Sequence, residues 1–166
     1  MTNISNKENT IIKEVISVIV KNEHNVLSRI AGLFSARGYN IDTLTVAPIE
    51  NCDEDLSKFT IAVTGDRRTL NQIVKQLNKL IPVLKVIEHK DFVQKDTVLI
   101  KISADENISN IKALVEAYNG LIQNVTDDSI IFSATDEPNR ITNLIKLIKR
   151  YNPSEIYRSG VVAMER

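Results

Sequence analysis

One order of strand and helix patterns occurs twice along this chain, and this repeat limits the possible folds more than any other feature. Apolar residues alternate or cluster as in strands, and between the strands they recur at helical spacing. The predicted strands are 15–20, 41–46, 59–63 and 83–87 in the first copy, and 97–103, 121–125, 129–133 and 156–162 in the second. The predicted helices are 26–34, 70–80, 108–115 and 141–148.

Each copy therefore has the order β-α-β-β-α-β, which is the ferredoxin-like arrangement. We expect an α+β fold of two such units in tandem, at 14–90 and 96–166, with 89–96 as a polar connection and 1–13 as a flexible N-terminal tail. Units of this size have small cores, and their antiparallel sheets leave long edges open to pairing. A homodimer is therefore expected on physical grounds.

Composition and charge narrow the functional class. Lys+Arg and Asp+Glu both number 21, so the net charge of zero predicts neither a nucleic-acid nor a membrane partner. The apolar runs have the length of strands, and the tail lacks the apolar core of a secretory signal. The single cysteine, Cys52, favours a reducing compartment. We expect the cytoplasm of a bacterium, or the plastid stroma if an organelle genome encodes the chain.

Residue types that carry catalysis are few and scattered. His24 and His89 lack metal-ligand spacing and are interpreted as inert surface histidines. Cys52 lies in a polar loop without an activating group. The carboxylates at 53–56 and 126–128 are interpreted as solvated turns rather than metal sites. The sequence therefore predicts a binding or regulatory protein with no catalytic residue and no metal of its own.

The turn after the first strand is the most promising place for a ligand. Asn22 and Asn25 lie in this turn, and Asn40 follows the helix. A helix N-terminus has unpaired N–H groups that suit a carboxylate, and an asparagine side chain can accept from an ammonium group. Ordinary capping explains the same residues, with Asn25 as N-cap and Asn40 as a left-handed residue. The local residues alone favour capping over ligand binding.

Four segments resemble the small subunit of acetolactate synthase (acetohydroxyacid synthase). They are NEHNVLSRIAGLFSARGYNIDTLTVAP (22–48), FTIAVTGD (59–66), QIVKQLNKLIPVLKV (72–86) and RSGVVAMER (158–166). The resemblance implies that 14–90 is an ACT domain, a ferredoxin-like module that binds amino acids at a homodimer interface. It also implies a C-terminal ferredoxin-like domain of the small subunit at 96–166.

The resemblance further implies a non-catalytic, regulatory role. Such a subunit binds the large catalytic subunit, raises its activity and confers feedback inhibition by valine. The large subunit is a transferase that carries thiamine diphosphate, Mg2+ and FAD. It condenses two pyruvates to 2-acetolactate and CO2, or pyruvate with 2-oxobutyrate, in the biosynthesis of valine, leucine and isoleucine.

Six positions match the family's valine contacts: Asn22, Asn25, Val26, Leu27, Asn40 and Ile41. The resemblance places Asn40 on the partner chain and gives Ile41 a place in the wall of the pocket. It also implies that the backbone N–H groups at the helix start face the ligand carboxylate.

Asn25 departs from the family, which most often has glycine there. Asparagine tolerates the left-handed backbone better than other non-glycine residues, but it adds bulk beside the ligand. We therefore expect weaker valine inhibition. The alternative function is a free-standing ACT-type amino-acid sensor that regulates another enzyme. Co-purification with a thiamine-diphosphate enzyme separates the two functions.

Overall fold

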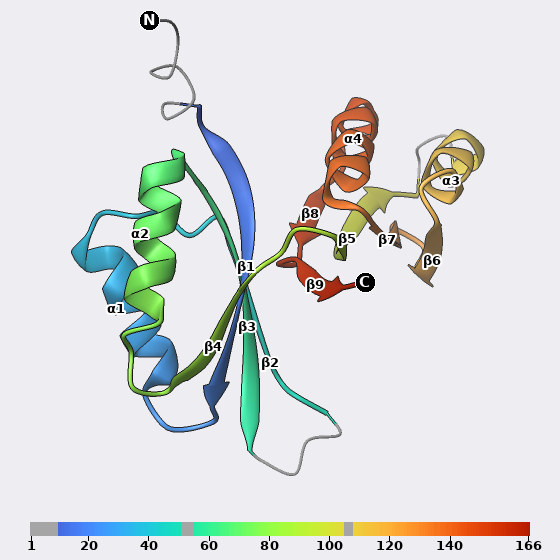
Figure 1. Ribbon diagram of the computed structural model, residues 1–166. Helices are drawn as coiled ribbons and strands as arrows, with labels where there is room; N and C mark the ends of the chain where they lie inside the picture. The colour runs from blue at the N-terminus through green and yellow to red at the C-terminus, as the bar shows by residue number, and fades with distance from the viewer. Residues whose placement is uncertain (1–9, 51–54, 105–107) are drawn as a thin grey trace, which may run out of the picture. The chain divides into compact units, whose positions relative to one another are not determined.

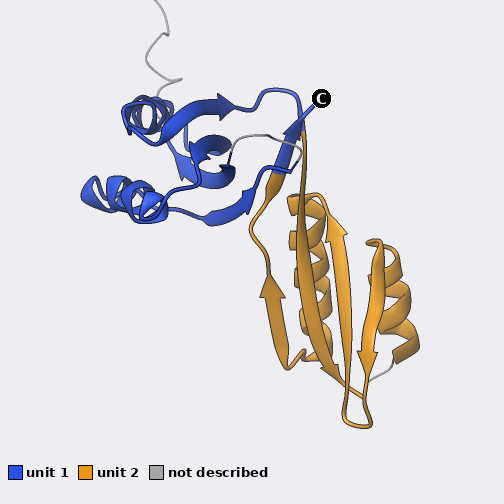
Figure 2. Ribbon diagram, turned by 90° about the horizontal axis from the view of Figure 1, so that it is seen from below, with its two compact units in different colours: residues 1–92, 163–166 blue, residues 93–162 orange. Residues whose placement is uncertain are grey.

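The computed structural model describes residues 10–50, 55–104 and 108–166. The described chain forms two compact units (Figure 2). The first unit contains the residues up to Phe92 together with Ala163–Arg166, and the second contains Val93–Val162. The α+β prediction of two tandem ferredoxin-like units is confirmed.

The first unit is a four-stranded antiparallel sheet with two helices on one face (Figure 1). Its elements are β1 (Ile12–Lys21), α1 (Val26–Ala36), β2 (Thr43–Pro48), β3 (Leu56–Gly65), α2 (Arg67–Leu77) and β4 (Val83–Glu88). The strands lie in the order β2-β3-β1-β4, so β1 and β3 are central and β2 and β4 are edges. β1 begins at Ile12, within the range expected to be a loose tail, and 1–9 lie outside the described residues.

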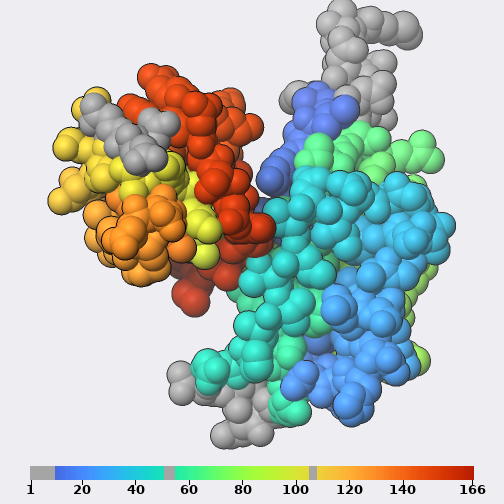
Figure 3. All heavy atoms as spheres, turned by 180° about the vertical axis from the view of Figure 1, so that it is seen from behind, coloured from blue at the N-terminus to red at the C-terminus, as the bar shows by residue number. Residues whose placement is uncertain are grey.

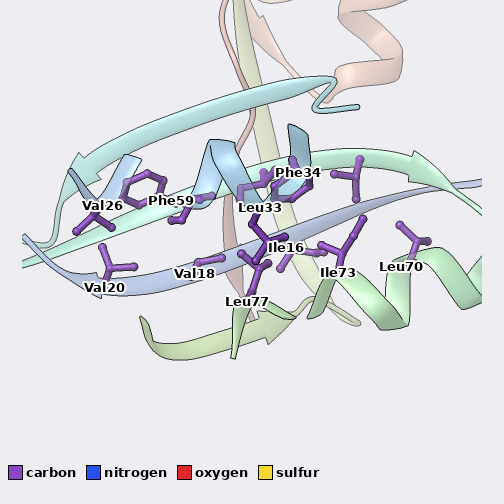
Figure 4. Packing of buried hydrophobic residues seen from close by; sticks show 13 residues of the cluster. Ile16, Val18, Val20, Val26, Leu33, Phe34, Phe59, Leu70, Ile73 and Leu77 are labelled. Carbon is purple, nitrogen blue, oxygen red and sulfur yellow. The ribbon is translucent and has the colours of Figure 1, made fainter. Parts of the chain in front are cut away.

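Alternate side chains of a strand point to one face, and apolar side chains three or four positions apart share one face of a helix, so these faces can pack together. Alternate residues of β1 point toward the helices, where they meet Leu33 and Phe34 of α1 and Ile73 of α2 (Figure 4). The buried cluster consists of Ile16, Val18, Val20, Val26, Ile30, Leu33, Phe34, Phe59, Ile61, Val63, Leu70, Ile73 and Leu77. Burial of each such large side chain contributes about 1.5–3 kcal/mol to folding.

The second unit repeats the architecture, with its four main strands in the order β6-β7-β5-β8. Its elements are β5 (Phe92–Ser103), α3 (Ile108–Glu116), β6 (Gly120–Val125), β7 (Ser129–Asp136), α4 (Pro138–Ile148), the 3-10 helix η1 (Lys149–Tyr151) and β8 (Glu155–Arg158). Phe92 already belongs to β5, so the polar connection predicted at 89–96 is shorter than expected. The polar residues Gln94, Lys95 and Asp96 predict a connection here, but the structure places them in β5 with Asp96 buried.

The last predicted strand, 156–162, is broken in the structure. β8 ends at Arg158, and a separate short strand, β9 (Val162–Glu165), closes the chain. At Ser159 the backbone N–H still donates to the Thr97 carbonyl, 2.8 Å away, and the Ser159 hydroxyl accepts from the Thr97 N–H. The extended pattern therefore continues past β8, and the strand is interrupted before β9.

A buried carboxylate connects three elements of the second unit. Asp136, at the end of β7, is 4% exposed, and it accepts from Lys95 at 2.8 Å and from Arg140 on α4. The Lys95 hydrogen bond is the largest cause that holds the pKa of Asp136 well below its usual range. A buried charge paired in this way stays ionised at neutral pH and fixes the start of α4.

Gly120→Ala is expected to destabilise the second unit. A Cβ at Gly120 would lie 2.2 Å from Val115 Cγ1 and 2.9 Å from the Ser133 carbonyl oxygen. The strain should lower the free energy of unfolding by about 1–3 kcal/mol. Hydrogen exchange of β5 amides measures the change. Gly32→Ala in α1 is the control, because a Cβ there meets nothing within 4 Å and should stabilise the helix by about 0.5–1 kcal/mol.

Candidate functional site

The turn that follows β1 is closed by Asn22 and Asp55. The Asn22 backbone N–H donates to the Asp55 carbonyl at 2.9 Å, and Asn22 Nδ2 donates to Asp55 Oδ1 at 2.9 Å. β1 ends at Lys21, which pairs with Leu56 at the start of β3. Asn22 therefore stands at a fixed position at the end of a central strand, with its side chain exposed to solvent.

Asn25 has a left-handed backbone, with φ 68° and ψ 7°. It occupies the N-cap position of α1, but its side chain makes no capping hydrogen bond. The capping explanation therefore fails for the Asn25 side chain, although its carbonyl accepts from the Arg29 N–H at 3.0 Å. The positive φ is the conformation for which glycine is best suited, and asparagine adopts it more readily than other residues with a Cβ.

The start of α1 leaves its first N–H groups without a side-chain cap. No acidic residue lies in its first turn either. Val26 is buried at 4% exposure and anchors the helix in the core, whereas Leu27 is about half exposed. The positive end of the helix dipole is therefore uncompensated by the residues of this turn, and an anion placed there would be stabilised.

In the segment before β2, the Asn40 side chain is held by Asp42, as Asn22 is held by Asp55. Asn40 Nδ2 donates to Asp42 Oδ1 at 3.0 Å, and Asp42 Oδ2 accepts from the Thr64 hydroxyl at 2.6 Å. Gly38, with φ 66°, takes the left-handed conformation that capping would have assigned to Asn40. Ile41 is half buried and packs against the core cluster of the first unit.

Within one chain, the end of β1 that leads into Asn22 and the start of β2 that follows Asn40 lie at opposite ends of the sheet (Figure 1). Asn22 follows Lys21, whereas β2 begins with Thr43, whose neighbour Ala62 pairs with Val15 near the other end of β1. Six residues of strand separate Val15 from Lys21, which corresponds to about 20 Å. The structure thus brings together Asn22, Asn25, Val26 and Leu27, and it leaves Asn40 and Ile41 apart from them.

A second polar cluster escaped the sequence interpretation. His89 is 8% exposed, so the prediction of an inert surface histidine is wrong as to its exposure. Its Nε2 lies 2.7 Å from Ser17 Oγ, and its Nδ1 lies 4.0 Å from Glu165 Oε1. Ser17 belongs to central β1 and has no exposed surface, so no substrate reaches this serine. The contact joins residues 72 apart in sequence, which no local pattern could reveal.

No group of three or more potential metal ligands occurs among residues 10–50, 55–104 and 108–166. Asp127 and Asp128 lie exposed in the turn between β6 and β7, whereas Cys52 and the carboxylates at 53–54 lie outside the described residues. In the same ranges, no helix is long and apolar enough to span a membrane.

Tandem ferredoxin-like units, with an uncapped helix start beside a central strand, place this chain in the class of ACT-type proteins. A family model described as "AHAS small subunit-like ACT domain" matches residues 16–85. A second, described as "Small subunit of acetolactate synthase", matches residues 95–166. Together the two models account for most of the chain.

Individual relatives agree with these models. A probable acetolactate synthase small subunit of Archaeoglobus fulgidus is 40% identical, over 93% of this chain and 98% of the relative. The acetolactate synthase small subunit of Bacillus subtilis is 39% identical, over 93% and 91%. The crystal structure of the small subunit from Thermotoga maritima has a TM-score of 0.84 at 34% identity, and the match covers 93% of this chain and 98% of that one. The chain belongs to the acetolactate synthase small subunit family.

The backbone at Asn25 makes a stability prediction. Asn25→Ala should lower the free energy of unfolding by about 1 kcal/mol, because alanine adopts a positive φ at a cost. Asn25→Gly should leave it unchanged or raise it slightly. Urea unfolding measures both. The same two substitutions at Asn152, which also has a positive φ, 46°, but lies in the second unit, serve as the matched control. Equal stability of the alanine and glycine variants at position 25 would contradict the left-handed backbone.

His89 predicts acid sensitivity of the first unit. Burial, and then the Lys58 cation, lower the pKa of His89 below its ordinary value of 6.5, while Glu165 opposes them. The unfolded chain then binds a proton that the folded chain does not, so the free energy of unfolding should fall as the pH drops through 6.5 toward the lower folded pKa. Urea titrations at several pH values measure this loss. His89→Gln should reduce it, and His24→Gln, which changes an exposed histidine, should not.

Proposed function

We propose that this chain is the regulatory subunit of an acetolactate synthase, which activates the catalytic subunit and transmits feedback inhibition by valine. Membership of the small subunit family supports the regulatory role. The observation that carries the ligand proposal is the turn at residues 22–27, where a left-handed Asn25 opens onto the uncapped start of α1.

The chemistry of this turn suits an α-amino acid. The ligand carboxylate would accept hydrogen bonds from the backbone N–H groups of Asn25, Val26 and Leu27, at the positive end of α1. The ammonium group would donate to the carboxamide oxygens of Asn22 and of Asn40. A branched apolar side chain would then pack against Ile41, which is half buried beside the core.

The opposite placement of Asn22 and Asn40 supports a homodimer with shared sites. β2 is an edge strand, and it lies at the molecular surface in cyan in Figure 3. If β2 pairs antiparallel with β2 of a second copy, Thr43 of each chain comes beside Pro48 of the other. Pro48 pairs with Ser57, and Ser57 pairs with Val20, at the end of β1 that leads into Asn22. Each pocket would therefore combine Asn22 of one chain with Asn40 and Ile41 of the partner subunit, which gives two sites per dimer.

The catalytic chemistry is proposed to belong to the large subunit. That subunit would carry thiamine diphosphate, Mg2+ and FAD, and would condense two pyruvates to 2-acetolactate and CO2. This chain would change the rate of that reaction by binding the large subunit. A ligand that binds the active and inhibited forms equally well would regulate nothing, so binding and inhibition are separate measurements.

Asn25 is proposed to weaken the response to valine. The left-handed backbone is retained, so the turn has the shape that glycine would give it. The asparagine side chain nevertheless adds a carboxamide beside the helix start, where the ligand carboxylate would lie. A ligand must displace or pack against this group, and part of its binding free energy is lost.

Reconstitution tests the proposal. The purified chain should co-purify with an acetolactate synthase catalytic subunit and raise its rate of acetolactate formation. Valine should inhibit the complex, and Asn25→Gly should lower the half-inhibitory valine concentration by about tenfold, the equivalent of ~1.4 kcal/mol. Asn152→Gly, at the other left-handed asparagine, is the control and should change nothing.

Two results would contradict the proposal. A chain that neither binds nor activates the catalytic subunit would indicate the free-standing amino-acid sensor instead. Strong inhibition by valine that Asn25→Gly leaves unchanged would contradict the weakening effect of Asn25, while leaving the regulatory role intact.

A further inference from the structure

The side chain of Asn22 has a defined orientation because of its partner. Its amide lies 2.9 Å from Asp55 Oδ1. An ionised carboxylate only accepts hydrogen bonds, so the amide atom that faces Asp55 must be the nitrogen. The Asn22 oxygen is thereby turned away from Asp55, and none of the described residues donates a hydrogen bond to it. The second bond of the pair, from the Asn22 N–H to the Asp55 carbonyl, fixes the two residues together.

Asn40 has the same arrangement with another aspartate. Its amide nitrogen donates to Asp42 Oδ1 at 3.0 Å. Asp42 is itself held, since its Oδ2 accepts from the Thr64 hydroxyl at 2.6 Å and its backbone N–H donates to the Ala62 carbonyl at 2.9 Å. The carboxylate is therefore fixed to β3 from both its side chain and its backbone. Asn40, like Asn22, keeps its carboxamide oxygen as the atom available to a donor.

We infer that Asp55 and Asp42 are positioning residues that turn the carboxamide oxygens of Asn22 and Asn40 toward the amino group of the effector. The inference rests on the proposed function and adds the cause of ligand selectivity. Two oriented acceptors, each backed by a carboxylate, suit an ammonium group, which has three donors and a positive charge. A hydroxyl group has one donor and no charge, so it gains less from the same atoms.

Closure of the two turns alone would explain the same hydrogen bonds. In that case the aspartates would stabilise the chain and have no influence on which ligand binds. The two roles differ in a measurable way. Loss of turn structure should weaken every ligand alike, whereas loss of oxygen orientation and of negative charge should weaken specifically a ligand that carries an ammonium group.

The experiment compares two ligands that differ only at this group: L-valine and (S)-2-hydroxy-3-methylbutanoate. Calorimetric titration of the full-length chain gives Kd for each, and the ratio of the two measures the preference for ammonium. Asp55→Asn and Asp42→Asn keep the size of the side chain but remove its charge and its obligatory acceptor role. Each should reduce the preference by about fivefold or more, mostly through weaker valine binding.

Two further variants act as controls. Asp127→Asn removes one exposed carboxylate from the second unit and should leave the preference unchanged. Asp55→Glu retains a carboxylate and should restore part of the preference that Asp55→Asn loses. Recovery in the glutamate variant shows that the charge and acceptor, rather than a damaged fold, carry the effect.

The outcomes separate this inference from the proposed function. If the wild-type chain binds valine but the aspartate variants weaken both ligands equally, the positioning role is wrong and the proposed function stands. If the wild-type chain binds valine and the hydroxy acid with equal affinity, the positioning role is likewise wrong. If the wild-type chain binds neither ligand, both the effector site and the positioning role are wrong.

Discussion

The pairing of β1 on both sides is the constraint on which the rest of the first unit depends. All ten residues of β1 pair with β3, and its second edge pairs with β4. One face of β1 packs into the core beneath both helices. Burial and hydrogen bonding therefore both hold this strand in place. The turn at its end therefore starts from a rigid point.

The proposed site would bind its ligand with a few polar groups at the molecular surface. Its groups are a helix terminus, one backbone conformation and two carboxamides, each held by a neighbouring aspartate. One chain carries these groups at the two ends of its sheet. If a second copy completes the proposed site, ligand binding and association of the two chains would be thermodynamically linked.

Periodicity was sufficient for most of the fold. The alternation at 59–63 and the apolar stripe from Leu70 to Leu77 correspond to β3 and α2, because sheet and helix burial impose different repeats on the sequence. Prediction was weaker where polar residues lie in strands. The sequence predicts a connection over Phe92–Asp96, which begins β5, and an exposed His89, which is buried. Both errors have one cause: the partners of these residues are distant in sequence.

By itself the sequence determined the repeated architecture, the family and the positions of the three asparagines. These follow from local patterns and from the residue types that turns tolerate. Tertiary structure alone decided that Asn25 has a positive φ without capping α1, and that Asn22 and Asn40 lie at opposite strand ends. It also decided which atom of the Asn22 carboxamide remains available, because Asp55 lies 33 residues from Asn22 and only folding brings the two together.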